Sequence, residues 1–80
     1  MITLQQAKNL KIGEILYHVY LKNKDGSSFR FKVNGKPKMW KRNHNRVRVP
    51  IKYGLFSYGE LTNGTFEGGS FTVNLRDVCK

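Results

Sequence analysis

The sequence predicts a mainly β protein, folded as one small SH3-like β-barrel of five or six short strands with one short N-terminal helix. The chain has 80 residues, enough for a single domain spanning residues 1–80. Apolar and polar residues alternate through much of the segment 14–75, and tight-turn signals separate the alternating stretches. Strands this short cannot form a sandwich of normal size, but they close into a small barrel. An OB-like barrel is the second choice, because it usually needs longer strands and an internal helix.

The helix is expected within residues 3–10. Thr3 followed by Gln6 fits a capping box, in which each side chain accepts the other residue's backbone N–H. Apolar residues then recur at helical spacing, at Leu4, Ala7 and Leu10. This pattern predicts about two helical turns over residues 4–9, and the barrel is expected over residues 14–75.

The first strand is expected to follow Glu14. Its two faces would hold Ile15, Tyr17, Val19 and Leu21 on one side and Leu16, His18 and Tyr20 on the other. Apolar residues on both faces are typical of a central, largely buried strand, so Tyr17 is expected inside. His18 is expected to be a hydrogen-bonded structural imidazole. The pair Asp25-Gly26 predicts a hairpin with a type I′ turn.

The next strands each have an apolar and a cationic face. Residues 28–33 place Phe29, Phe31 and Val33 inward and Arg30 and Lys32 outward. A short strand is expected at Lys38–Arg42. Residues 46–53 then place Val47, Val49, Ile51 and Tyr53 inward and Arg46, Arg48 and Lys52 outward. Pro50 implies an edge strand or a break, because proline has no N–H to donate to a sheet.

The remaining segments complete the barrel. Residues 55–61 are rich in aromatic side chains, Asn63-Gly64 predicts a turn, and residues 70–75 predict a last strand. Its inward side would hold Phe71, Val73 and Leu75. Glu60 and Glu67 fall in or near turns and have no partner at helix or strand spacing.

Positive charge is concentrated in the middle of the chain. The net charge is +10, and eleven of the fifteen Lys and Arg residues lie between Lys22 and Lys52, where Asp25 is the only acid. Clustered cations repel one another and regain that energy when phosphates displace counterions, which indicates a polyanionic partner. We expect a nucleic acid, DNA rather than RNA, bound through its phosphate backbone with little base specificity. The candidate binding residues are Arg30, Lys32, Lys36, Lys38, Trp40, Lys41, Arg42, Arg46, Arg48 and Lys52.

Two alternatives for the aromatic residues stay open. Trp40 is either a core or rim residue of the barrel or a stacking platform for an unpaired base. The four tyrosines have the same ambiguity, with Tyr17 and Tyr53 expected to be buried and Tyr20 and Tyr58 freer.

Catalysis, metal binding and membrane insertion find no support in the pattern. Cys79 is the only cysteine, His18 and His44 lack further ligands, and five acids are widely spread. We therefore expect no enzymatic activity, no cofactor and no metal. The opening residues lack a leader pattern and no stretch has the length of a membrane span, which predicts a cytoplasmic protein without a membrane partner. A monomer or weak dimer is expected.

Several segments resemble a set of small bacteriophage-encoded proteins that have no assigned activity. The similar segments are Leu4 with residues 7–18, Val33 to Lys36, Trp40-Lys41 and Arg46 to Leu55. The step Leu10-Lys11-Ile12-Gly13-Glu14 is also similar to the opening of many SH3-like and KOW-type barrels. The resemblance implies a phage origin, hence the cytoplasm of a host cell, and a small-barrel fold. It implies no catalytic residue.

Two rival functions remain open at this point. A phage protein-interaction module could bind an acidic surface of a host protein in the transcription, replication or defence machinery, since SH3-like barrels commonly bind proteins. A minor structural component of the virion could use the same basic surface against packaged DNA.

Overall fold

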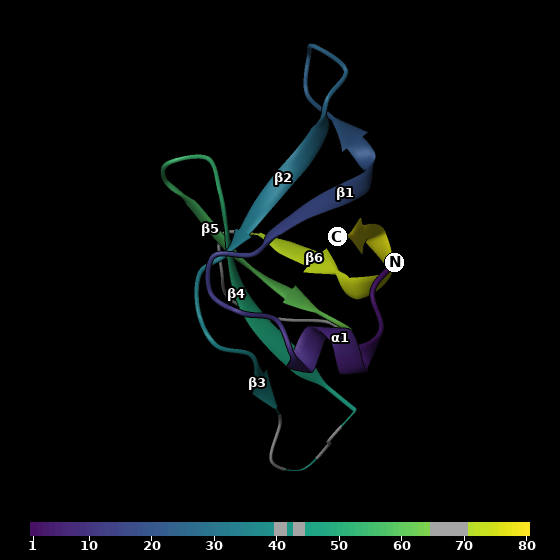
Figure 1. Ribbon diagram of the computed structural model, residues 1–80, viewed down its shortest axis with the longest axis vertical. Helices are drawn as coiled ribbons and strands as arrows, with labels where there is room; N and C mark the ends of the chain where they lie inside the picture. Colours follow the sequence, from purple (N-terminus) through teal and green to yellow (C-terminus); the bar gives the residue numbers. More distant parts are fainter. Residues whose placement is uncertain (40–41, 43–44, 65–70) are drawn as a thin grey trace.

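The predicted fold class is confirmed. The computed structural model describes residues 1–39, 42, 45–64 and 71–80, of which 49% are in strands and 11% in helices. Six strands follow the order β6-β5-β4-β2-β1-β7 and form a nearly closed barrel, and β3 pairs with β4 beside this path. The molecule is elongated, 42 × 23 × 22 Å, and the β1–β2 hairpin projects from one end of it (Figure 1).

The helix α1 (Leu4–Lys8) begins with the expected capping box. Thr3 Oγ1 accepts the Gln6 N–H at 3.1 Å, and Gln6 Oε1 accepts the Thr3 N–H at 2.8 Å. Ala7 is fully buried, and α1 packs against β4, as Figure 1 shows. The helix therefore contributes to the core of the barrel.

Strand β1 (Ile15–Lys22) is not buried on both faces, so that prediction was wrong. Leu16 is fully buried, whereas Ile15 is 42% and Tyr17 38% exposed. Only the inner face of a barrel strand contacts the core, and among the described residues no second layer covers this outer face. His18 is buried as expected, and its Nδ1 accepts two backbone N–H groups at 3.0 Å each, from residues 20 and 21. These bonds satisfy donors where β1 departs from regular pairing with β2.

The hairpin between β1 and β2 (Ser28–Val33) has a longer loop than predicted. The loop spans residues 23–27, and the Gly26 N–H donates to the Asn23 carbonyl at 3.0 Å. Gly26 has a φ of 89°, but no non-glycine residue among the described ones has a positive φ. A type I′ turn needs positive φ at both central residues, so the turn at Asp25-Gly26 is not of that type.

Strand β4 (Val47–Tyr53) lies between β2 and β5, so of the two alternatives for Pro50 the edge strand was wrong, whereas the pairing to β2 and β3 does break there. The Pro50 carbonyl accepts the Asn34 N–H at 2.8 Å. In an antiparallel pair a residue's nitrogen and carbonyl point to the same neighbour, so the proline nitrogen also faces the end of β2. There the β2–β4 pairing stops at Val33 and Ile51, and β3 (Lys38–Met39) pairs only from Arg48. The missing donor therefore breaks no ladder bond.

The C-terminal part of the barrel differs from the single strand predicted at residues 70–75. β5 (Ser57–Thr62) runs parallel to β6 (Thr72–Asn74), and the chain continues into a 3-10 helix, η1 (Leu75–Asp77). β7 (Val78–Cys79) then pairs with β1 at Tyr17 and His18. The barrel thus extends beyond residue 75, and its last strand lies against its first.

The core contains the inward residues of β2 and β4, as the alternation predicted. Phe31, Val33, Val47, Val49 and Ile51 are buried. Phe29 and Tyr53 are partly buried and stack with their ring centroids 4.8 Å apart. The outward residues of the same strands are consequently oriented by a well-packed inner face.

Candidate nucleic-acid interface

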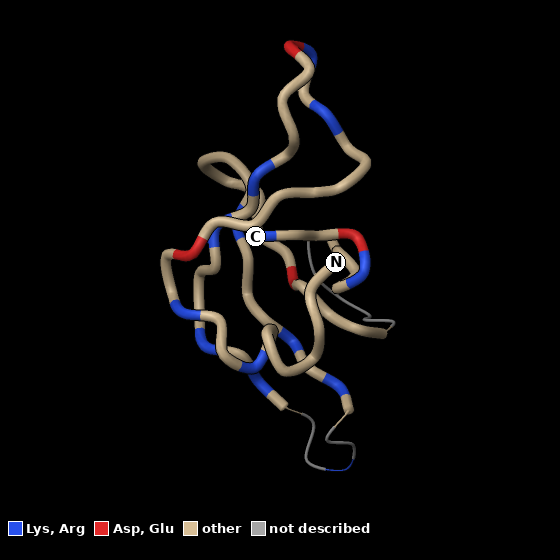
Figure 2. Tube along the Cα trace, turned by 45° about the vertical axis from the view of Figure 1, so that its right-hand side comes forward, with Lys and Arg blue, Asp and Glu red and all other residues tan. Residues whose placement is uncertain are grey.

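The outer face of β2 and β4 brings three of the predicted cations together. Lys32 and Lys52 are cross-strand partners, and Arg30 lies two residues before Lys32 on the same face of β2. Arg30 and Lys32 are exposed, whereas Lys52 is half-buried. In the part of the chain that is described, no ion pair forms to any of these three side chains. Figure 2 shows further Lys and Arg positions in the lower half of the trace, with few acidic positions among them.

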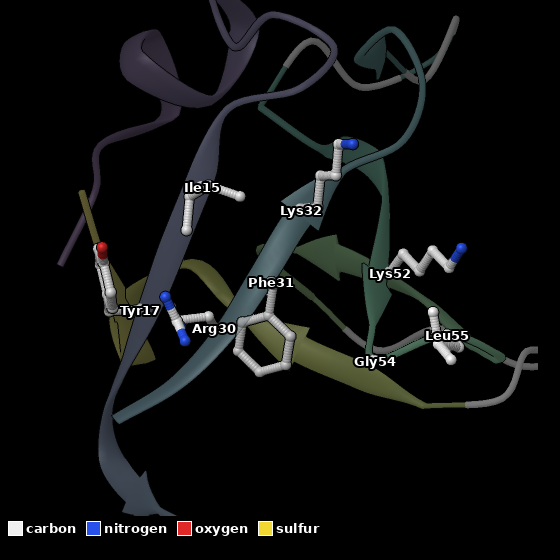
Figure 3. A pocket seen from close by; sticks show the side chains of 8 residues that line it. All are labelled: Ile15, Tyr17, Arg30, Phe31, Lys32, Lys52, Gly54 and Leu55. Atoms are coloured by element: carbon white, nitrogen blue, oxygen red, sulfur yellow. The ribbon is translucent and has the colours of Figure 1, made fainter. Parts of the chain in front are cut away.

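These cations lie in a groove of about 390 Å³ with apolar rims (Figure 3). Ile15 and Tyr17 border it on the β1 side, and Leu55, in the loop between β4 and β5, borders it on the other. Cross-strand register explains the first rim, since Tyr17 pairs with Arg30 and Ile15 pairs with Lys32. The groove therefore alternates apolar and cationic side chains across neighbouring strands. Its lining residues are Ile15, Tyr17, Arg30, Phe31, Lys32, Lys52, Gly54 and Leu55.

An aromatic ring extends this surface onto β5. Tyr58 is the cross-strand partner of Lys52, and the Lys52 Nζ lies 5.3 Å from the centroid of its ring. The contact is a cation–π interaction at a partly exposed site. Tyr58 is 47% exposed, as the sequence suggested, whereas Tyr17 was wrongly expected to be buried.

Arg48 differs from the other predicted cations because an acid neutralises it. Its Nε and one terminal nitrogen donate to the two carboxylate oxygens of Glu60 at 2.6 and 3.0 Å. The sequence placed Glu60 in or near a turn, without a second carboxylate at helix or strand spacing, and did not predict this ion pair. Glu60 lies within β5 opposite Pro50, and its carboxylate reaches the arginine across the β4–β5 pair. The positive charge of β4 is therefore concentrated at Lys52.

The remaining predicted cations lie around β3. Lys38 pairs with Arg48 across β3 and β4, so the two share one face, and Lys36 and Arg42 are exposed. The predicted strand Lys38–Arg42 is described only at Lys38–Met39, and Arg42 lies in a bend. Arg46 is half-buried, not fully outward. Trp40 and Lys41 lie outside the described residues, as do His44 and Glu67.

The groove's apolar rims were not among the predicted site residues. Ile15 and Leu55 were missed, and Leu55 is 75% and its neighbour Phe56 86% exposed. A signal for Leu55 existed in the sequence, because it follows Gly54 and glycine favours turns and loops. In the structure Gly54 has a φ of 68° and begins the exposed loop between β4 and β5. For Ile15 the sequence offered no signal, because both faces of β1 are apolar.

The described residues contain no group of three or more His, Cys, Asp or Glu side chains placed to hold a metal ion. Among them, no helix has the length and apolar character needed to cross a membrane. Cys79 is half-buried and forms no disulfide.

Comparison with protein-family models, with curated proteins and with solved structures finds no match to this chain. The resemblance to phage proteins and the SH3-like subtype of the barrel therefore stay predictions.

Proposed function

We propose that this chain is a non-catalytic nucleic-acid-binding protein that contacts the phosphate backbone through the outer face of β2 and β4. Its proposed phosphate ligands are Arg30, Lys32 and Lys52, together with Lys38 of β3, which lies opposite Arg48 of β4 on the same face. Strands present these side chains and no described helix carries a comparable cluster, so the proposal includes little readout of base sequence.

The observation that carries the proposal is the direct opposition of Lys32 and Lys52. Like charges on a cross-strand pair destabilise a sheet, and no described acid pairs with either residue. A polyanion removes this repulsion, because each phosphate contact also releases condensed counterions. Glu60 shows the contrast, since it neutralises Arg48 but leaves the Lys32–Lys52 pair without an acid.

The test is a fluorescence-anisotropy titration of labelled random-sequence DNA, duplex and single-stranded, at several salt concentrations. Three to four phosphate contacts predict a slope of log affinity against log salt of about −3 to −4 on duplex and about −2 to −3 on single strands. A slope near zero, or no binding at low salt, would contradict the proposal.

Charge-reversal variants make this test specific to the proposed face. Lys32→Glu with Lys52→Glu should abolish binding, whereas Lys8→Glu with Lys24→Glu changes the net charge equally and should retain most of it. Lys8 is the last residue of α1 and Lys24 lies in the hairpin loop, and neither lines the groove. Arg48 is a poor choice for this test, because its replacement also leaves the Glu60 carboxylate without its partner.

A second candidate is docking to a protein with an acidic surface. The exposed Leu55 and Phe56 beside the cations favour it, because protein interfaces combine apolar anchors with charged rims. Under this function the protein would fail to retain random DNA at low salt but would bind one acidic partner, and both Phe56→Ser and Lys52→Glu would weaken that complex.

A further inference from the structure

The groove on the outer face combines two features that backbone contacts alone do not require. Its floor carries Arg30, Lys32 and Lys52, and its rims carry Tyr17 and Leu55 (Figure 3). Contacts to phosphates need only the cations. The apolar rims indicate that the ligand also presents apolar surface between its charges.

Four apolar or aromatic side chains at or beside this site are exposed. Leu55 is 75% and Phe56 86% exposed, and Tyr17 and Tyr58 are 38% and 47% exposed. They flank the cations from both sides, from β1 and from the β4–β5 hairpin. Such a cluster beside cations is a feature of surfaces that stack bases.

Duplex and single-stranded nucleic acids differ in what they offer to such a surface. The base faces of a duplex are covered by stacking, and side chains reach only the base edges and the phosphates. Unpaired bases expose their faces to aromatic and apolar side chains. A groove of about 390 Å³ lies within the range of about 300–1,000 Å³ that accommodates one small ligand, so it has room for one or two nucleotide units.

We infer that the ligand of this groove is a single-stranded nucleic acid, with an unpaired base packed between Tyr17 and Leu55 and the flanking phosphates on Arg30, Lys32 and Lys52. This inference rests on the proposed function and deepens it by naming the strand form. Tyr58 lies across Lys52 from Lys32, in position to contact the next base of the strand.

The first arm of the experiment uses three labelled probes whose labelled strands each have 15 nucleotides. They are oligothymidine, its duplex with oligoadenine, and an oligonucleotide with abasic sites in place of its bases. Oligothymidine should bind at least tenfold more tightly than either of the other two. Equal or tighter binding of the duplex, or undiminished binding of the abasic probe, would overturn the single-strand inference and leave the proposed function intact. Absence of salt-dependent binding to all three would overturn both.

The second arm removes apolar surface without changing charge. Tyr17→Ser should weaken oligothymidine binding by between about five- and 150-fold, because stacking of a base on one aromatic side chain contributes that much. Leu55→Ser should also weaken it, because its apolar contact with the base is lost. The salt slope should not change, since no phosphate contact is lost. Tyr20→Ser is the matched control, because Tyr20 is 74% exposed but does not line the groove. Equal effects of Tyr17→Ser and Tyr20→Ser, with Leu55→Ser inert, would overturn the inference.

Discussion

Replacement of Lys32 by Gln should stabilise the protein and weaken its binding to nucleic acid at the same time. Lys32 lies directly opposite Lys52 on the β2–β4 pair, and Gln retains most of the side-chain stem while removing the charge. Like charges at this spacing destabilise a sheet by about 0.2–1 kcal/mol, so the free energy of unfolding should rise by that amount. Lys32 is the better member of the pair to change, because Lys52 also contacts the Tyr58 ring.

The loss of binding follows from the same charge. One phosphate contact contributes about 0.7–0.9 to the salt slope, which corresponds to roughly a five- to eightfold loss of affinity at 0.1 M salt. Urea unfolding monitored by circular dichroism gives the stability, and fluorescence anisotropy gives the affinity. The gain in stability should disappear near 1 M salt, where the Debye length is about 3 Å.

Two controls identify the cause of the gain. In the Lys52→Gln background, Lys32→Gln should produce no further stabilisation, because the repulsive pair is already absent. Lys24→Gln removes the same charge from the hairpin loop and should leave stability nearly unchanged. If Lys32→Gln destabilised the protein, or gave the same gain in both backgrounds, the reasoning from cross-strand repulsion would be refuted.

Glu60→Gln should lower the free energy of unfolding by about 1 kcal/mol, because its partly buried arginine partner on β4 loses a two-point ion pair. It should also raise nucleic-acid affinity and the magnitude of the salt slope, because that arginine is no longer neutralised. Unchanged binding would show that this end of β4 does not contact phosphate. Gly59→Ala should lower the free energy of unfolding by about 1–3 kcal/mol in urea titrations, because the added Cβ would clash with the Phe71 carbonyl oxygen. An unchanged free energy of unfolding would mean that the Phe71 backbone does not lie against Gly59. The Ser27 hydroxyl and backbone N–H lower the pKa of Asp25 below its usual value. This carboxylate therefore stabilises the fold above its unfolded-state pKa and loses that contribution as the pH falls through its folded-state pKa. NMR titration of Ser27→Ala should show the Asp25 pKa closer to normal, and an unchanged pKa would exclude the hydroxyl as the main cause.

The cations of the candidate site could be predicted from the sequence. The neutralisation of Arg48 by Glu60 and the apolar rims of the groove could not. Alternation in two strands placed Arg30, Lys32 and Lys52 outward, because side chains on a strand have a strict period of two. Which of these cations meets an acid depends on strand pairing. Glu60 reaches Arg48 only because β5 lies antiparallel to β4 in one register.

The exposure of Tyr17 could not be predicted without knowledge of the barrel. Both faces of β1 are apolar, so its pattern is compatible with either face inward, and the choice is made by which face contacts the core. Leu16 and His18 are buried there, which leaves Tyr17 beside Arg30 on the outside. The same argument applies to Pro50, whose missing donor is harmless only because it faces the gap between β2 and β3.

The sequence by itself determined the local features: the capped helix, the alternating strands of a small barrel and the segregation of positive charge. These depend on contacts between near neighbours and on composition, which are visible along the chain. Only the tertiary structure decided which strands are adjacent, which cation is neutralised and where apolar rims border the cations. Such relations join residues far apart in sequence, such as Tyr17 and Leu55 at one groove, and they follow from strand order and register.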